Sequence, residues 1–267
     1  MSRFFSLLLL CGLFPPASGC STLVQRKNVL PARHTLVLDP LIVHSDFRLP
    51  PHHRLLNELV LERNELLATL NLAKSEEQVQ VYLFDSEERF RDFLGRYYPD
   101  FPPRRAFFVE SDTRLTVYAY WGDRVAEDLR HEVAHGYLHA VAPNLPLWLD
   151  EGLAEYAEVP QGNGGLNQPH VQLLLEKLGQ HSWRPNLDRL ERLTSASEMT
   201  QSDYAEAWAW VHWLLQGDAA GRQLVQTYLA ELRQGLRVPP FSARLSGPQQ
   251  AHDGLLIAHL QALAARR

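Results

Sequence analysis

Residues 131–156 of this 267-residue chain read HEVAHGYLHAVAPNLPLWLDEGLAEY. Two histidines, His131 and His135, lie four positions apart within a segment whose apolar spacing predicts a helix. Because an α-helix has about 3.6 residues per turn, their side chains leave one face a turn apart and can converge on one cation. Pro143 and Pro146 separate this helix from a second one. The segment therefore predicts two neighbouring helices, the first of which carries a pair of metal ligands.

Glu132 follows the first histidine and points into the same cleft at a slightly different angle. A carboxylate in that place can take a proton from a metal-activated water without acting as a ligand. A catalytic zinc site also needs a third protein ligand and an open position for water. The second helix offers three acids for the third position, Asp150, Glu151 and Glu155.

The HExxH pattern followed by Trp148-Leu-Asp-Glu-Gly152 resembles the gluzincin zinc metallopeptidases, the thermolysin-like members of the peptidase-MA group. The resemblance implies that one zinc ion is held by His131, His135 and Glu151, with Glu132 as the general base. It also implies a thermolysin-like architecture, in which Gly152 lets the two helices approach closely.

The same resemblance suggests roles for two further residues. Glu155 lies one turn after Glu151, where a carboxylate of the thermolysin pattern bonds the far nitrogen of a histidine ligand; a solvated helix acid is the alternative. Tyr204 opens a segment similar to one that presents a catalytic tyrosine to the oxyanion, although core packing is an equal alternative. Asp150 is a lesser candidate for a metal-site role, and His212 and Tyr137 are weaker oxyanion donors.

His139 extends the histidine series by another turn, so a site of three histidines has to be considered. The eight residues from His131 to His139 rise about 12 Å on an intact helix, and zinc–nitrogen bonds are only about 2 Å long. His139 therefore cannot join both other histidines on one ion. We expect it to be a hydrogen-bonded histidine at the end of the helix.

The periodicity of the chain predicts strands first and helices afterwards, which is typical of an α+β fold. Short strands are expected within 34–44 and at 79–84, 106–109 and 115–120, and helices dominate after Gly122. We expect a small N-terminal sheet with helices, the zinc-site helices, and a C-terminal helical lobe. The resemblance implies a metallopeptidase domain at 35–267, which we expect to divide into an α/β part at 35–142, containing the HExxH helix, and a helical part at 143–267. Strand 115–120 is expected to be the edge strand that pairs with an extended substrate.

The first 19 residues have the charged start, short apolar run and small-residue ending of an export signal. Ala17-Ser-Gly-Cys20 resembles a bacterial lipobox, which implies a lipid on Cys20; an ordinary cleavable signal is the alternative. Cys11 would be lost with the signal, so Cys20 would have no disulfide partner. We expect a lipidated tether at 20–34. Ser21 favours the outer membrane of a bacterial envelope, with the domain facing the periplasm.

The formal net charge is only -5, and Lys and Arg form no long run, so a nucleic-acid partner is not expected. With 45% hydrophobic residues the chain can bury a substantial core. The sequence predicts a membrane-tethered zinc peptidase that hydrolyses peptide or protein substrates in the cell envelope. Two alternatives stay open: a catalytically silent zinc-binding scaffold or binding protein, and a zinc hydrolase of non-peptide amides or esters.

Overall fold

The computed structural model describes residues 30–235 and 237–266. The strands are β1 His34–Leu38, β2 Leu41–Ser45, β3 Val79–Phe84, β4 Ala106–Ser111 and β5 Arg114–Tyr120. The helices are α1 Arg54–Leu70, α2 Glu87–Tyr97, α3 Val125–His139, α4 Leu147–Ala157, α5 Gln168–Gly179, α6 Leu187–Leu190, α7 Gln201–Gln216, α8 Ala219–Arg233 and α9 Gln249–Ala265. Two 3-10 turns lie at Ala196–Glu198 and Phe241–Arg244. The predicted α+β class is confirmed.

The five strands form one sheet in the order β1-β2-β3-β5-β4. The inner pairs β2–β3 and β3–β5 are parallel, and the outer pairs β1–β2 and β4–β5 are antiparallel. The prediction that strand 115–120 is an edge strand is wrong, because β5 lies between β3 and β4. A short turn pairs β4 with β5 as a hairpin, and local sequence does not say which hairpin strand faces outward. Within the described residues the edge on this side is β4.

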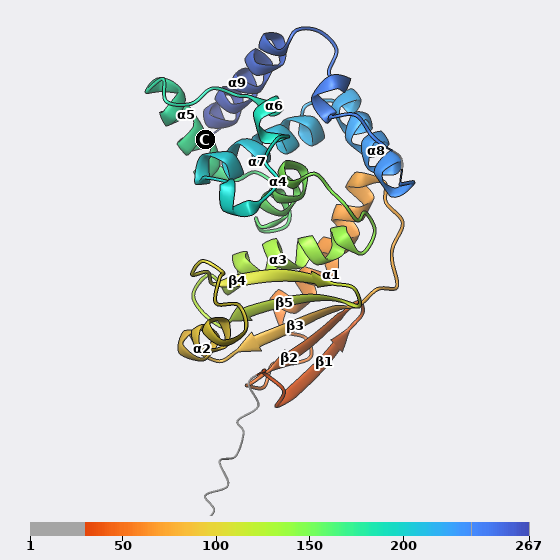
Figure 1. Ribbon diagram of the computed structural model, residues 1–267, viewed down its shortest axis with the longest axis vertical. Coiled ribbons are helices and arrows are strands. Elements are labelled where there is room, and N and C mark those ends of the chain that lie inside the picture. Colours follow the sequence, from red (N-terminus) through yellow and green to blue (C-terminus); the bar gives the residue numbers. More distant parts are fainter. Residues whose placement is uncertain (1–29, 236, 267) are drawn as a thin grey trace, which may run out of the picture.

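Helices α1 and α3 lie between the sheet and helices α4 to α9, as Figure 1 shows. One face of the sheet packs on them through buried residues such as Leu56, Val81 and Val133. The opposite face is partly covered by α2, which contributes Phe90 and Phe93 to an aromatic cluster. Because apolar side chains of α1 and α3 also enter the core of the helical part, both parts of the chain share these two helices.

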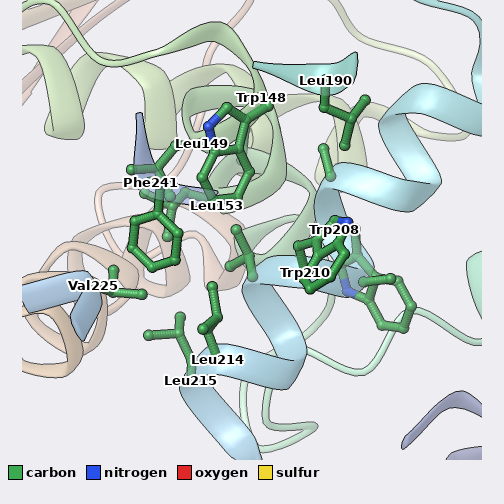
Figure 2. Close-up of a cluster of buried hydrophobic side chains, with 14 of the residues drawn as sticks. Trp148, Leu149, Leu153, Leu190, Trp208, Trp210, Leu214, Leu215, Val225 and Phe241 are labelled. Carbon is green, nitrogen blue, oxygen red and sulfur yellow. The ribbon is translucent and has the colours of Figure 1, made fainter. Parts of the chain in front are cut away.

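Helix α4 is held against α7 in the middle of the helical core. Figure 2 shows Trp148, Leu149 and Leu153 of α4 gathered with Leu214 and other apolar side chains from α7 and its neighbours. All four side chains are buried. Gly152 lies at the closest approach, because a Cβ added there would lie 2.6 Å from the carbonyl oxygen of Ala207. The expectation that Gly152 lets α4 approach α3 is therefore wrong, because its close contacts are with α7.

Candidate metal centre

Helices α3 and α4 bring three potential ligand atoms to one point. Nε2 of His131 and Nε2 of His135 are 3.3 Å apart, and Oε2 of Glu151 lies 3.6 Å from the first and 3.7 Å from the second. Zinc bonds of about 2.0–2.1 Å in a tetrahedron place ligand atoms about 3.4 Å from one another. The triangle therefore has the size that one metal ion requires, and these three residues form a group that could hold one.

A carboxylate faces the far nitrogen of each histidine. Oδ1 of Asp150 lies 3.0 Å from Nδ1 of His135, and Oε2 of Glu158 lies 3.3 Å from Nδ1 of His131. A carboxylate accepts the Nδ1 proton and leaves Nε2 free as a ligand atom. The structure therefore orients both imidazoles so that the same nitrogen of each points at Glu151.

The prediction for Glu155 as the partner of a histidine ligand is wrong. Its Oε2 lies 2.7 Å from Nε2 of His170, a buried histidine of α5. Asp150, the lesser candidate from the sequence, takes the predicted role for His135. Sequence reasoning missed Glu158, although it lies seven residues after Glu151 and so two turns further along one face of α4. Asn167 donates to the second oxygen of Glu158 at 2.7 Å and holds it in place.

The acidic surroundings favour positive charge at the centre. Burial lowers the pKa of His135, but the charge of Asp150, its hydrogen bond to the ring and the nearby Glu151 carboxylate outweigh it and raise the pKa to about 10. Burial likewise opposes charge on Glu151, yet the His131 and His135 rings beside it lower its pKa to about 2. A cation at the point where these side chains meet would be stabilised by the same carboxylates.

Glu132 lines the same cleft as the three ligand atoms. Burial raises the pKa of its carboxyl group, and the nearby histidines oppose that shift without cancelling it. A carboxylate with a raised pKa is a stronger base than one in water, which suits a proton acceptor. The structure thus places the predicted base beside the metal-binding triangle and outside it.

The cleft has a volume of about 1080 Å³ and also reaches Arg104 and Tyr204. The hydroxyl of Tyr204 is 3.5 Å from the carbonyl oxygen of Ala196, and burial together with the charge of Glu151 raises its pKa to about 12. Tyr204 therefore keeps its proton near neutral pH and can donate it in a hydrogen bond. The weaker candidates lie elsewhere: Tyr137 donates to the Leu59 carbonyl at 2.9 Å, and His212 is 2.8 Å from His259.

His139 forms no metal-compatible group with His131 among the described residues. Its Nε2 lies 3.0 Å from Oδ2 of Asp150, and its Nδ1 lies 2.6 Å from Oε2 of Glu110. Its atoms are also close enough to those of His135 and Asp150 for an alternative group, but Asp150 already bridges the two rings by hydrogen bonds. The expectation of a hydrogen-bonded histidine at the end of α3 is therefore confirmed.

Neither a protein-family model nor a curated protein matches this sequence. Cys20 and the signal, as well as most of the tether, lie outside the described residues. Along 30–235 and 237–266, no helix is both long and apolar enough to cross a membrane.

Proposed function

We propose that the chain is a zinc-dependent peptidase of the gluzincin type with a thermolysin-like architecture. The observation that carries the proposal is the triangle of His131 Nε2, His135 Nε2 and Glu151 Oε2, with Glu132 beside it in a large cleft. Two imidazoles and one carboxylate are a ligand set of catalytic zinc. The α+β fold, with the HExxH helix packed on a sheet and a helical part beyond it, supports the same assignment.

A zinc ion bound by these residues would polarise the scissile carbonyl and acidify a water molecule. Glu132 accepts the proton of the attacking water and passes it to the leaving amine. Tyr204 donates a hydrogen bond to the carbonyl oxygen as negative charge develops on it. The five side chains thus divide the chemistry, because three hold the ion, one moves the proton and one stabilises the oxyanion.

The substrate is an extended peptide or protein segment. Strand β4 has an unpaired edge within the described residues, and Ala106 at its start lines the cleft. Backbone N–H and C=O groups at such an edge can pair with a peptide of almost any sequence. This replaces β5 with β4 as the strand expected to align the scissile bond beside Glu132.

The protein is further proposed to be anchored by a lipid on Cys20 to the outer membrane of a bacterial envelope, with the domain in the periplasm. The support is the signal-like sequence of residues 1–19 and the match of Ala17–Cys20 to a lipobox. Cys20→Ala should abolish incorporation of labelled fatty acid. Labelling that persists in this variant would show that Cys20 is not the anchor.

The central test compares the wild-type protein with Glu132→Gln, using Glu127→Gln as the matched control. Both variants lose one carboxylate of α3, and both positions line the cleft. We expect one zinc per chain in all three proteins, and a fall in peptide-cleavage rate of about 10² to 10⁴-fold for Glu132→Gln alone. A diverse peptide library serves as substrate.

The outcomes separate the proposed function from its rivals. A wild-type protein that takes up no zinc would contradict the metal site. Zinc binding without cleavage of any peptide by the wild type would favour a scaffold, or a hydrolase of non-peptide amides or esters if such compounds are cleaved. Equal cleavage by the wild type and Glu132→Gln would refute the role of Glu132.

A further inference from the structure

A chain of hydrogen bonds connects the end of β4 to the metal centre. Oδ1 of Asp150 lies 3.0 Å from Nδ1 of His135, and its other oxygen lies 3.0 Å from Nε2 of His139. The far nitrogen of His139 is in turn 2.6 Å from Oε2 of Glu110. Glu110 belongs to β4, both histidines to α3, and Asp150 to α4. Three separate elements therefore meet behind one predicted metal ligand.

We propose that His139 and Glu110 are positioning residues that fix the orientation of Asp150 and, through it, of the metal ligand His135. The proposal rests on the metal site of the proposed function. It goes beyond that site because it assigns a role to two residues that touch neither the ion nor the substrate.

The two oxygens of Asp150 are held by different histidines. A carboxylate held by only one hydrogen bond can rotate about its terminal bond, and the imidazole it serves can then tilt. In this structure the second oxygen is held by His139, so the plane of the carboxylate is set from both sides. Metal affinity depends on such outer partners, and their loss typically costs about 10 to 100-fold.

His139 is itself fixed on several sides. The Asp150 side chain is 14% exposed and that of His139 is 18% exposed, so their hydrogen bond is largely shielded from water. The ring of Phe108 lies 5.0 Å from the ring of His139, edge to face, and stacks 5.9 Å from the ring of His135. Because Phe108 packs against both rings, it restricts the movement of both imidazoles.

Glu110 completes the arrangement from the sheet. Its side chain is 46% exposed, so on its own it would add little stability. Its value lies in a second point of attachment: both partners of the ring are carboxylates, which only accept, so His139 donates to Asp150 and Glu110 together as an imidazolium with an N–H on each nitrogen. Removing Glu110 takes away one of the two acceptors that fix the His139 ring, so the ring can turn and its hydrogen bond to Asp150 is held less firmly.

The test measures zinc affinity by competition with a chelator, and the visible spectrum of the cobalt-substituted protein, for wild type, His139→Phe and Glu110→Ala. Phenylalanine keeps the ring that packs on Phe108 and removes both hydrogen bonds. The matched control is His44→Phe, because His44 also has both ring nitrogens in hydrogen bonds and stacks on an aromatic ring, in the sheet.

We expect about tenfold weaker zinc binding for His139→Phe, a smaller loss for Glu110→Ala, and a shifted cobalt absorption band in both. His44→Phe should match the wild type in both measurements, even if it unfolds at a lower temperature. If His139→Phe fails to fold, as judged by circular dichroism, the exposed Glu110→Ala variant decides alone.

Wild-type zinc affinity and an unchanged cobalt spectrum in both variants would overturn the proposal while leaving the metal site intact. A wild-type protein that binds neither ion would overturn the site and this proposal together. Loss of affinity in the variants without any peptidase activity in the wild type would support the positioning role and contradict only the proposed reaction.

Discussion

Gly152→Ala should loosen the helix that carries Glu151. A Cβ at this position would lie 2.6 Å from the backbone oxygen of Ala207 and 2.8 Å from Cγ2 of Val211, whereas ordinary contact begins near 3.4 Å. The backbone atom cannot swing aside, so α4 and α7 must separate by about 0.8 Å. Overpacking of this kind costs about 1–3 kcal/mol, and alanine returns up to about 1 kcal/mol through its higher helix propensity.

The expected net loss is about 1–2 kcal/mol in the free energy of unfolding, or a fall of about 2–8 °C in Tm for a domain of this size. Zinc affinity should fall as well, because Glu151 precedes Gly152 and moves with it. Thermal unfolding followed by circular dichroism and a chelator competition measure the two effects.

Gly95→Ala in α2 and Gly254→Ala in α9 are the controls, because a Cβ at either glycine meets nothing within 4 Å. Both should be neutral or stabilising by up to about 1 kcal/mol. A Gly152→Ala protein that melts at or above the wild-type temperature would refute the close-contact argument.

Two further outcomes test single side chains. Tyr204→Phe should lower the peptide-cleavage rate by about 10²-fold or more while zinc affinity stays unchanged, since only the proposed oxyanion donor is lost. An unchanged rate would show that Tyr204 contributes only to packing. Glu62 is buried with no hydrogen-bond partner for either carboxylate oxygen among the described residues, and burial raises its pKa well above the ordinary value of 4.5. The folded state therefore holds this proton where the unfolded state has lost it, and stability declines as the pH rises above about 4.5. Glu62→Gln removes this decline. The free energy of unfolding of the variant, measured with urea, should therefore increase relative to that of the wild type as the pH rises. Stability profiles of the two proteins that run parallel over pH would exclude the effect.

The triangle of His131, His135 and Glu151 was largely predictable because it depends on local spacing. Two histidines four residues apart on a helix face the same way in any fold, and Glu151 follows from the resemblance of Trp148–Gly152 to a known ligand segment. The carboxylates behind the histidines were not predictable, because their assignment depends on how α4 crosses α3. Glu155 and Glu158 are only three residues apart, and the crossing turns the first towards His170 and the second towards His131.

The order of the strands and helices along the chain was predictable for a similar reason. Which element packs beside which in space was not predictable. Strand 79–84 alternates and begins and ends as the periodicity predicts. The position of β5 inside the sheet depends instead on the crossover through α2, which places β3 beside it. In α1, Glu62 lies three residues after Leu59 and four before Leu66, on the apolar stripe of the helix. Its residue type nevertheless indicates a surface position, because glutamate is almost never fully buried without a partner. Its burial results from the packing of α1 between the sheet and the helical part.

The positions of the acids on α4 allow the effect of helix packing on the metal site to be separated from the effect of the hydrogen-bond chain. Helix α4 and its C-cap carry the proposed ligand Glu151 as well as Asp150 and Glu158, the two carboxylates that face the histidines. A shift of α4 disturbs all three together, so Gly152→Ala should change stability and metal affinity in parallel. His139→Phe disturbs only Asp150 and leaves the packing of α4 on α7 intact. If both proteins lost zinc affinity only in proportion to their loss of stability, the metal site would depend on helix packing alone, and the hydrogen-bond chain to Glu110 would have no separate effect.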